Sequence, residues 1–118
     1  TDSVCYSDSS LITCFANDYG YEHWLENAIK FYAQKQDLVI LISSSGNSLN
    51  MINAATIAKQ KELPLVTLTG FSPDNKLRNH GDVNFWVNSK SYNIVEMTHQ
   101  YWLLSIMDFI IVQKSNDD

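Results

Sequence analysis

The sequence lacks any long apolar run and has few basic residues. No stretch approaches the roughly 20 consecutive apolar residues of a membrane span, and the first five residues have neither the basic stretch nor the apolar core of a secretory signal. We therefore expect a cytoplasmic protein without a membrane partner. Eight Lys and Arg residues against thirteen Asp and Glu give a net charge of −5. The basic residues form no cluster, which argues against direct nucleic-acid binding.

Cysteine is also scarce. Cys5 and Cys14 are the only two, and their spacing fits no metal-ligand motif. A cytosolic compartment would keep both thiols reduced. We expect them to behave as small buried hydrophobic residues.

The 118 residues suffice for one domain, and β-like and helical segments alternate along them. The expected strands are Val4–Tyr6, Leu38–Ile42, Leu65–Thr69 and Asn84–Val87. The expected helices are Asp8–Ala16, Glu22–Gln36, Ser48–Glu62 and Tyr92–Val112, and the polar tail Lys114–Asp118 is expected to be disordered. The second and third strands are rich in β-branched residues and almost continuously apolar, which is typical of parallel strands covered on both faces. The pattern predicts an α/β fold with a doubly wound, Rossmann-like parallel sheet of flavodoxin type and helices on both faces.

A serine-rich loop directly follows the second strand and directly precedes a helix. It reads Ser43-Ser44-Ser45-Gly46-Asn47-Ser48. Ligands of open α/β sheets bind where strands end, and the N-terminus of a helix favours an anion. We therefore expect this loop to bind phosphate, with a polar turn and a good helix cap as the plain alternative. It has neither the lysine of a Walker loop nor the three glycines of a dinucleotide-binding loop.

The chain resembles the sugar isomerase (SIS) family, and within it the bacterial phosphoheptose (sedoheptulose-7-phosphate) isomerases. The resemblance covers nearly the whole chain and rests on Ser7-Asp8, Asn17-Asp18-Tyr19-Gly20-Tyr21, Ile42 to Ser48, Leu68-Thr69-Gly70, Asp82, and a last helix with Glu96 and His99. It implies a phosphate group held by Ser43, Ser44, Ser45, Asn47 and Ser48, with Asp18 near the sugar hydroxyls. Asp18 has an equal alternative as a turn residue before Gly20.

Two departures from the family pattern concern catalysis. Family members begin with a helical region, a first strand, a Gly-Asn-Gly-Gly-Ser loop and a helix with the catalytic glutamate, so we expect residues 1–118 to form a single SIS-type domain without that N-terminal part. The last helix of phosphoheptose isomerases carries a Gln and, eight residues later, a catalytic or metal-binding His. Glu96 and Leu104 occupy these positions here.

Glu96 and His99 are the candidate catalytic residues on that helix. An aldose–ketose isomerisation moves a proton between adjacent carbons and needs a base that reaches both. Glu96 could be that base, or it could be a solvated or salt-bridged helix residue; His99 lies three residues later on the same face. Family members can bind zinc, but no third and fourth ligand is evident, so we expect no metal and no other cofactor.

The second half of the last helix is apolar nearly all round, at Tyr101, Trp102, Leu103, Ile106, Met107, Phe109, Ile110 and Ile111. Packing on the sheet would bury one side, and a homo-oligomer interface, a dimer or tetramer as is usual in the family, would bury the other. The function that the resemblance implies is isomerisation of a phosphosugar. The alternative is a non-catalytic module that binds phosphosugars for regulation or oligomerisation.

Overall fold

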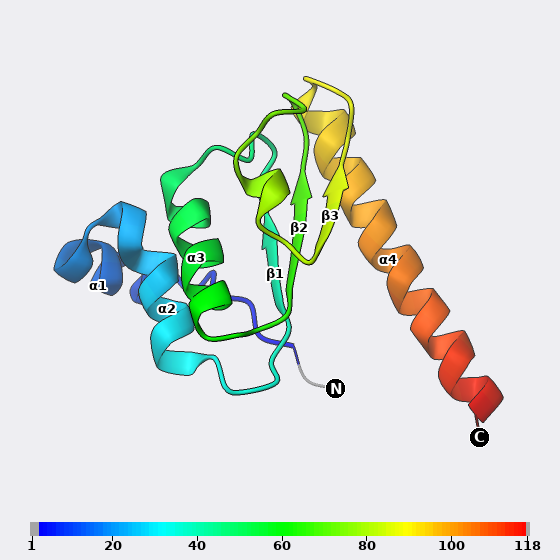
Figure 1. Cartoon of the computed structure of the whole chain (residues 1–118), viewed down its shortest axis with the longest axis horizontal. Coiled ribbons are helices and arrows are strands. Elements are labelled where there is room, and N and C mark those ends of the chain that lie inside the picture. The colour runs from blue at the N-terminus through cyan, green and yellow to red at the C-terminus, as the bar shows by residue number, and fades with distance from the viewer. Residues whose placement is uncertain (1–2, 118) are drawn as a thin grey trace.

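Residues 3–117 are described by a computed structural model of the chain (Figure 1). Its three strands form one parallel sheet in the order β1-β2-β3. Helices α2 and α3 lie on one face of the sheet and α4 on the other (Figure 1), which confirms the predicted α/β class. In chain order the elements are α1 (Ser9–Tyr19), the 3₁₀ turn η1 (Tyr21–His23), α2 (Trp24–Tyr32), β1 (Val39–Ile42), α3 (Leu49–Gln60), β2 (Leu65–Thr69), the 3₁₀ turn η2 (Leu77–Asn79), β3 (Val83–Trp86) and α4 (Tyr92–Asp117).

The hydrophobic core lies between the sheet and the pair α2 and α3. Ala54, Ala55 and Ala58 of α3 are completely buried, and their small side chains let the helix approach the strands closely. Leu41 of β1 and Leu65 of β2 point into the same core, at 3% and 0% exposure. This packing fixes the N-terminus of α3 next to the end of β1.

Strand β2 is the buried centre of the sheet, whereas β1 lies at its edge. In β2, Leu65, Thr67, Leu68 and Thr69 are all fully buried. In β1, Ile40 and Ile42 are 44% and 45% exposed, and a pocket lies between Ile42 and α4. The prediction that both strands sit inside a sheet is therefore confirmed for β2 and wrong for β1 within the described part of the chain.

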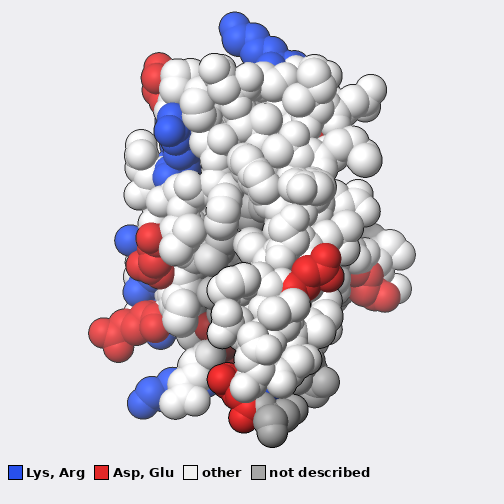
Figure 2. Space-filling model, turned by 90° about the vertical axis from the view of Figure 1, so that its right-hand side faces the viewer, with Lys and Arg blue, Asp and Glu red and all other residues white. Residues whose placement is uncertain are grey.

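Helix α4 packs on the sheet through its first half only. Val95 lies so close to Gly70, the residue after β2, that a Cβ on the glycine would be 2.6 Å from a Val95 methyl group. Val95 and His99 are buried, and Trp102 packs against Phe85 of β3 with ring centroids 5.5 Å apart. From residue 104 onward every described residue of the helix is exposed. Figure 2 shows that charged side chains are sparse on the outer side of this helix and gather mostly near the edges of the face. The expected sheet packing of the second half is therefore not found.

Three further predictions are wrong. Val4–Tyr6 is not a strand, because Tyr6 stacks on the ring of Tyr32 in α2 and Val4 is exposed. Cys5 and Cys14 are exposed rather than buried. The tail is helical as far as Asp117, where Ser115 Oγ donates to the carbonyl of Ile111 at 3.0 Å; Asp118 lies outside the described residues. None of the described helices is both long enough and apolar enough to span a membrane.

Candidate functional site

The serine loop, residues 43–48, continues β1 for one residue and then turns into α3. The N–H of Ser43 donates to the carbonyl of Leu68 at 3.0 Å, and the N–H of Gly70 donates to the carbonyl of Ser44 at 2.9 Å. The chain turns at Gly46, whose φ of +65° is a left-handed conformation that favours glycine. The Ser43 hydroxyl accepts from Gly46 N at 3.1 Å, and the Ser45 hydroxyl accepts from Asn47 N at 3.3 Å. Sequence and geometry together make this a tight turn at the carboxyl edge of the sheet.

The loop leaves several hydrogen-bond donors available. Ser48 is the N-cap of α3, yet its side chain makes no capping bond. The N–H groups of Leu49 and Asn50, in the first turn, have no acceptor among the described residues. Ser43 is buried and shapes the loop, whereas Ser44 and Ser45 are half-buried and Asn47 and Ser48 are exposed. These donors, together with the positive end of the helix dipole, suit an anion.

A lysine lies beside this loop, which itself contains no basic residue. The backbone N–H of Lys76, just before η2, donates to Asn47 Oδ1 at 3.1 Å. The Lys76 side chain is exposed and forms no ion pair within residues 3–117. Sequence reasoning missed this neighbour, because the contact joins residues 29 positions apart and nothing in the local sequence announces it.

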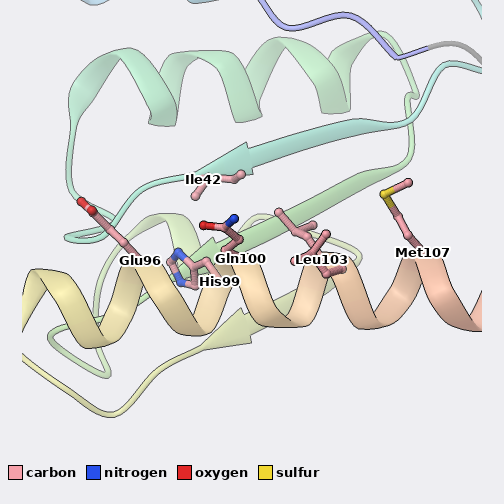
Figure 3. A pocket seen from close by; sticks show the side chains of 7 residues that line it. Ile42, Glu96, His99, Gln100, Leu103 and Met107 are labelled. Atoms are coloured by element: carbon pink, nitrogen blue, oxygen red, sulfur yellow. The ribbon is translucent and has the colours of Figure 1, made fainter.

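Glu96 and His99 of α4 line an apolar pocket of about 250 Å³ beside the outer face of β1. In Figure 3 the carboxylate of Glu96 points toward the loop that follows β1, and Ile42 faces the helix across the pocket. Leu103, Leu104 and Met107 form the rest of the apolar wall. Glu96 therefore lies near the carboxyl edge of the sheet. Its side chain is exposed rather than buried.

His99 is buried, with an exposure of 2%. Its Nε2 lies 2.8 Å from the carbonyl oxygen of Thr69, and because a carbonyl only accepts, Nε2 must carry the proton. Its Nδ1 has no partner among the described residues. The ring therefore connects α4 to the end of β2, and the lone pair of Nδ1 accepts no hydrogen bond from the described residues.

Asp18 is not brought to the serine loop. It lies on the exposed surface of α1, and its carboxylate accepts a weak bond from the Cys14 thiol at 3.8 Å. Helix α1 contacts α2 and lies on the far side of α2 and α3 from the sheet (Figure 1). Asp18 lies in the last turn of α1, which ends at Tyr19 with Gly20 as its C-cap, and not in a loop. Within residues 3–117 no group of three or more His, Cys, Asp or Glu residues is arranged to hold a metal ion.

Comparison with known proteins identifies the family. A model of the SIS domain family matches residues 11–107. The chain belongs to the SIS domain family. It is 38% identical over 106 residues to the phosphoheptose isomerase of Fusobacterium nucleatum, covering 90% of this chain and 54% of that protein. It is 34% identical over 106 residues to the phosphoheptose isomerase of Colwellia psychrerythraea, covering 88% and 54%. The chain thus spans about half the length of these curated relatives.

Solved structures give the same fold. The phosphoheptose isomerase of Neisseria gonorrhoeae superposes with a TM-score of 0.80 at 26% identity, over 88% of this SIS chain and 59% of that one. The phosphoheptose isomerase of Francisella tularensis superposes with a TM-score of 0.81 over 89% and 56%; its identity of 24% supports the fold alone. The resemblance stated from the sequence motifs is confirmed, and so is the predicted fold class.

Proposed function

We propose that this chain binds a phosphorylated sugar and takes part in its aldose–ketose isomerisation. The observation that carries the proposal is the serine loop, with its free hydroxyls and unpaired N–H groups at the N-terminus of α3. Its relatives' names, phosphoheptose isomerase, supply the substrate class, a seven-carbon sugar phosphate. The phosphate group would lie against Ser44, Ser45, Asn47, Ser48 and the first turn of α3.

The helix-end field alone contributes only about 0.3 to 2 kcal/mol to anion binding, so several hydrogen bonds must share the work. Lys76 lies beside the loop and would add a positive charge that the loop itself lacks. A charge-assisted contact to phosphate is stronger than a neutral one. We assign Lys76 to the phosphate subsite on that ground.

For the chemistry, Glu96 is the base that the geometry favours. Isomerisation removes a proton from the carbon next to the carbonyl group while the carbonyl oxygen gains one, which gives an enediol; a proton then returns to the former carbonyl carbon as the hydroxyl group on the neighbouring carbon loses its own. A carboxylate that points toward the phosphate loop can exchange protons with both carbons of a bound sugar (Figure 3). His99 is better suited to anchoring α4, because its Nε2 proton is already committed to Thr69. No step of this isomerisation calls for a cofactor.

The second candidate function is phosphosugar binding without turnover. Leu104 lies in the pocket wall at the position where the resemblance implies an acid–base histidine. An isobutyl group cannot transfer a proton. If Glu96 does not suffice alone, the same site would hold the ligand unchanged and act in regulation or assembly.

Thermal-shift titration of the purified chain separates these functions. The ligands are sedoheptulose 7-phosphate, inorganic phosphate and unphosphorylated sedoheptulose. A ligand at about 100 times its Kd stabilises the folded state by about 2.7 kcal/mol, a readily measured change in Tm. Stabilisation by both phosphates but not by sedoheptulose supports the phosphate site, and NMR analysis of the sugar after incubation then distinguishes isomerisation from binding. No stabilisation by either phosphate would contradict the proposal.

The exposed second half of α4 supports self-association as a further property of the chain. Tyr101, Met107, Phe109 and Ile111 are 58% to 70% exposed, and few charged side chains lie on the outer side of α4 (Figure 2). Contiguous apolar surface of this kind marks an interaction site in proteins that do not aggregate. A second copy of the chain offers the same apolar helix, so a symmetric helix-to-helix contact would cover both surfaces at once.

A further inference from the structure

The segment after β2 holds the serine loop in shape from one side. The N–H of Leu77 donates to the carbonyl of Gly46 at 2.9 Å, and that of Lys76 donates to Asn47 Oδ1 at 3.1 Å. Together with the bond from Gly70 N to the carbonyl of Ser44, three hydrogen bonds connect the serine loop to the segment after β2. The conformation of the loop therefore depends on residues outside it.

Asn75 is the centre of this segment. Its side chain is 1% exposed, and its Nδ2 lies within hydrogen-bonding distance of Thr69 Oγ1 (3.0 Å), the carbonyl of Ser72 (3.0 Å) and the carbonyl of Gly70 (3.2 Å). Its Oδ1 accepts from the N–H of Arg78 at 2.9 Å. A flipped amide would set an oxygen against two carbonyls and an NH₂ group against an N–H, so only one orientation is satisfied.

The Asn75 side chain also forms the wall against which Gly46 turns. A Cβ added to Gly46 would overlap the side-chain carbonyl group of Asn75. Gly46 is thus required twice, by its φ of +65° and by this close approach. The backbone of the serine loop therefore contacts the side-chain amide of Asn75, which is buried and has all its hydrogen-bonding groups paired.

Thr69 links Asn75 to α4. Its hydroxyl accepts from Asn75, and its carbonyl accepts from His99 Nε2 at 2.8 Å. One residue at the end of β2 therefore connects the wall behind the serine loop to the helix that carries Glu96. The connection is buried throughout, since Thr69, Asn75 and His99 are all at most 2% exposed.

We propose that Asn75 is the positioning residue of the phosphate subsite: it holds Gly46, and with it the donors of the serine loop, at a fixed place relative to α4. The inference rests on the proposed phosphate binding. Asn75 itself would not touch the ligand, because its donors and acceptor are used within the protein. Its loss should weaken binding of the phosphate group, whatever sugar that group carries, because a preformed set of donors would become mobile.

Isothermal calorimetry of the whole chain tests this role, with inorganic phosphate and sedoheptulose 7-phosphate as ligands. Asn75→Ala removes every bond of the side chain. Asn79→Ala is the matched control, an exposed asparagine four residues later with no side-chain bond in the described structure. Ile29→Val, in the core at α2 and 1% exposed, controls for loss of stability alone. All proteins are measured well below their Tm.

We expect Asn75→Ala to weaken both ligands by the same factor of about tenfold or more, as supporting residues of binding sites commonly do, while both controls keep the wild-type affinity. Unchanged affinity in Asn75→Ala, or an equal loss in Ile29→Val, would overturn the role. If Asn75→Ala does not fold, Asn75→Asp carries the test: it keeps the acceptor for Arg78 N but sets a carboxylate oxygen against the Gly70 and Ser72 carbonyls, so the same loss is expected.

Hydrogen–deuterium exchange without ligand gives a second and independent measurement. The amides of Gly46 and Asn47 should exchange faster in Asn75→Ala than in Ile29→Val, and equal exchange would overturn the positioning role. If the wild-type chain binds neither phosphate nor the sugar phosphate, the proposed function fails as well. If the wild-type chain binds them and Asn75→Ala binds them equally well, only the role of Asn75 is refuted.

Discussion

His99 Nε2 donates a hydrogen bond of 2.8 Å to the carbonyl oxygen of Thr69, and both groups are buried. The bond ties α4 to the last residue of β2, at the edge of the sheet where the serine loop also begins. Val95, one turn earlier on the helix, packs on Gly70 next to the same strand end. Together with the packing of Trp102 on Phe85, these two contacts hold Glu96 in its position relative to the loop.

Replacing His99 with Leu should lower the free energy of unfolding by about 0.5 to 1.5 kcal/mol, the net contribution of one hydrogen bond, because the carbonyl of Thr69 keeps its second bond, from the N–H of Val87 at 3.0 Å. Urea denaturation followed by circular dichroism measures the change. Gln100→Leu is the control, since Gln100 is the exposed neighbour and receives the same new side chain. Equal stability of His99→Leu and the wild type would mean that the bond to Thr69 contributes nothing.

Replacing Ser45 with Asp should abolish phosphate binding and preserve the fold. The new carboxylate would lie in the middle of the serine loop and repel the anion, and its oxygens could still accept from the N–H of Asn47 as the hydroxyl does. Calorimetry with inorganic phosphate measures the affinity. Ser10→Asp, at the exposed start of α1, adds the same charge away from the loop and should bind normally. Undiminished affinity in Ser45→Asp would exclude the loop from the site.

The alternating pattern of the sequence was sufficient for the fold class and for the strands β1 and β2, because a continuously apolar segment followed by a polar loop has few other structural solutions. It could not place β1 at the edge of the described sheet, since strand order depends on long-range pairing, and it could not anticipate the exposed outer face of β1, since that depends on where α4 runs. Val4 to Tyr6 has strand-like composition, but the Tyr6 ring finds its partner in Tyr32, a long-range contact that local propensity cannot anticipate.

For the candidate site, local composition identified the serine loop, whereas the residues that pack against the loop could not be predicted from the sequence. Asn75 and Lys76 stand in a segment that reads as an ordinary polar turn, and only the fold brings them against Gly46 and Asn47. His99 illustrates the opposite case: the sequence marked it as a candidate for catalysis, and its burial and its bond to Thr69 support an anchoring role instead.

Glu26 lies near the start of α2, and its carboxylate makes the free energy of unfolding depend on pH. Its carboxylate accepts from Lys30 Nζ at 2.9 Å and lies 2.8 Å from His23 Nδ1, and His23 Nε2 in turn lies 4.0 Å from a carboxylate oxygen of Glu22. The bond from Lys30, followed by that from His23, lowers the pKa of Glu26 from its ordinary value of 4.5. A lowered folded-state pKa stabilises the protein above the unfolded value, and this contribution is lost as the pH falls through the folded pKa.

Glu26→Gln should therefore be less stable than the wild type at pH 6, and the difference should shrink as the pH falls below about 4.5. Urea denaturation at pH 6 and pH 3 measures both values. Glu62→Gln is the control, because Glu62 has no ion pair among the described residues. A difference between Glu26→Gln and the wild type that stays constant from pH 6 to pH 3 would contradict the assignment.

Replacing Phe109 with Asp should prevent the proposed self-association. Phe109 is 63% exposed in the apolar half of α4, so a carboxylate there is harmless in a monomer but buried and unpaired in a helix-to-helix contact. Trp102→Asp is less informative, because Trp102 packs on Phe85 and its loss would disturb the monomer itself. Gln113→Asp adds the same charge at an exposed polar position of the helix and serves as the control. Light scattering coupled to size exclusion should show an oligomer for the wild type and Gln113→Asp and a monomer for Phe109→Asp, whereas a monomeric wild type would rule out the contact.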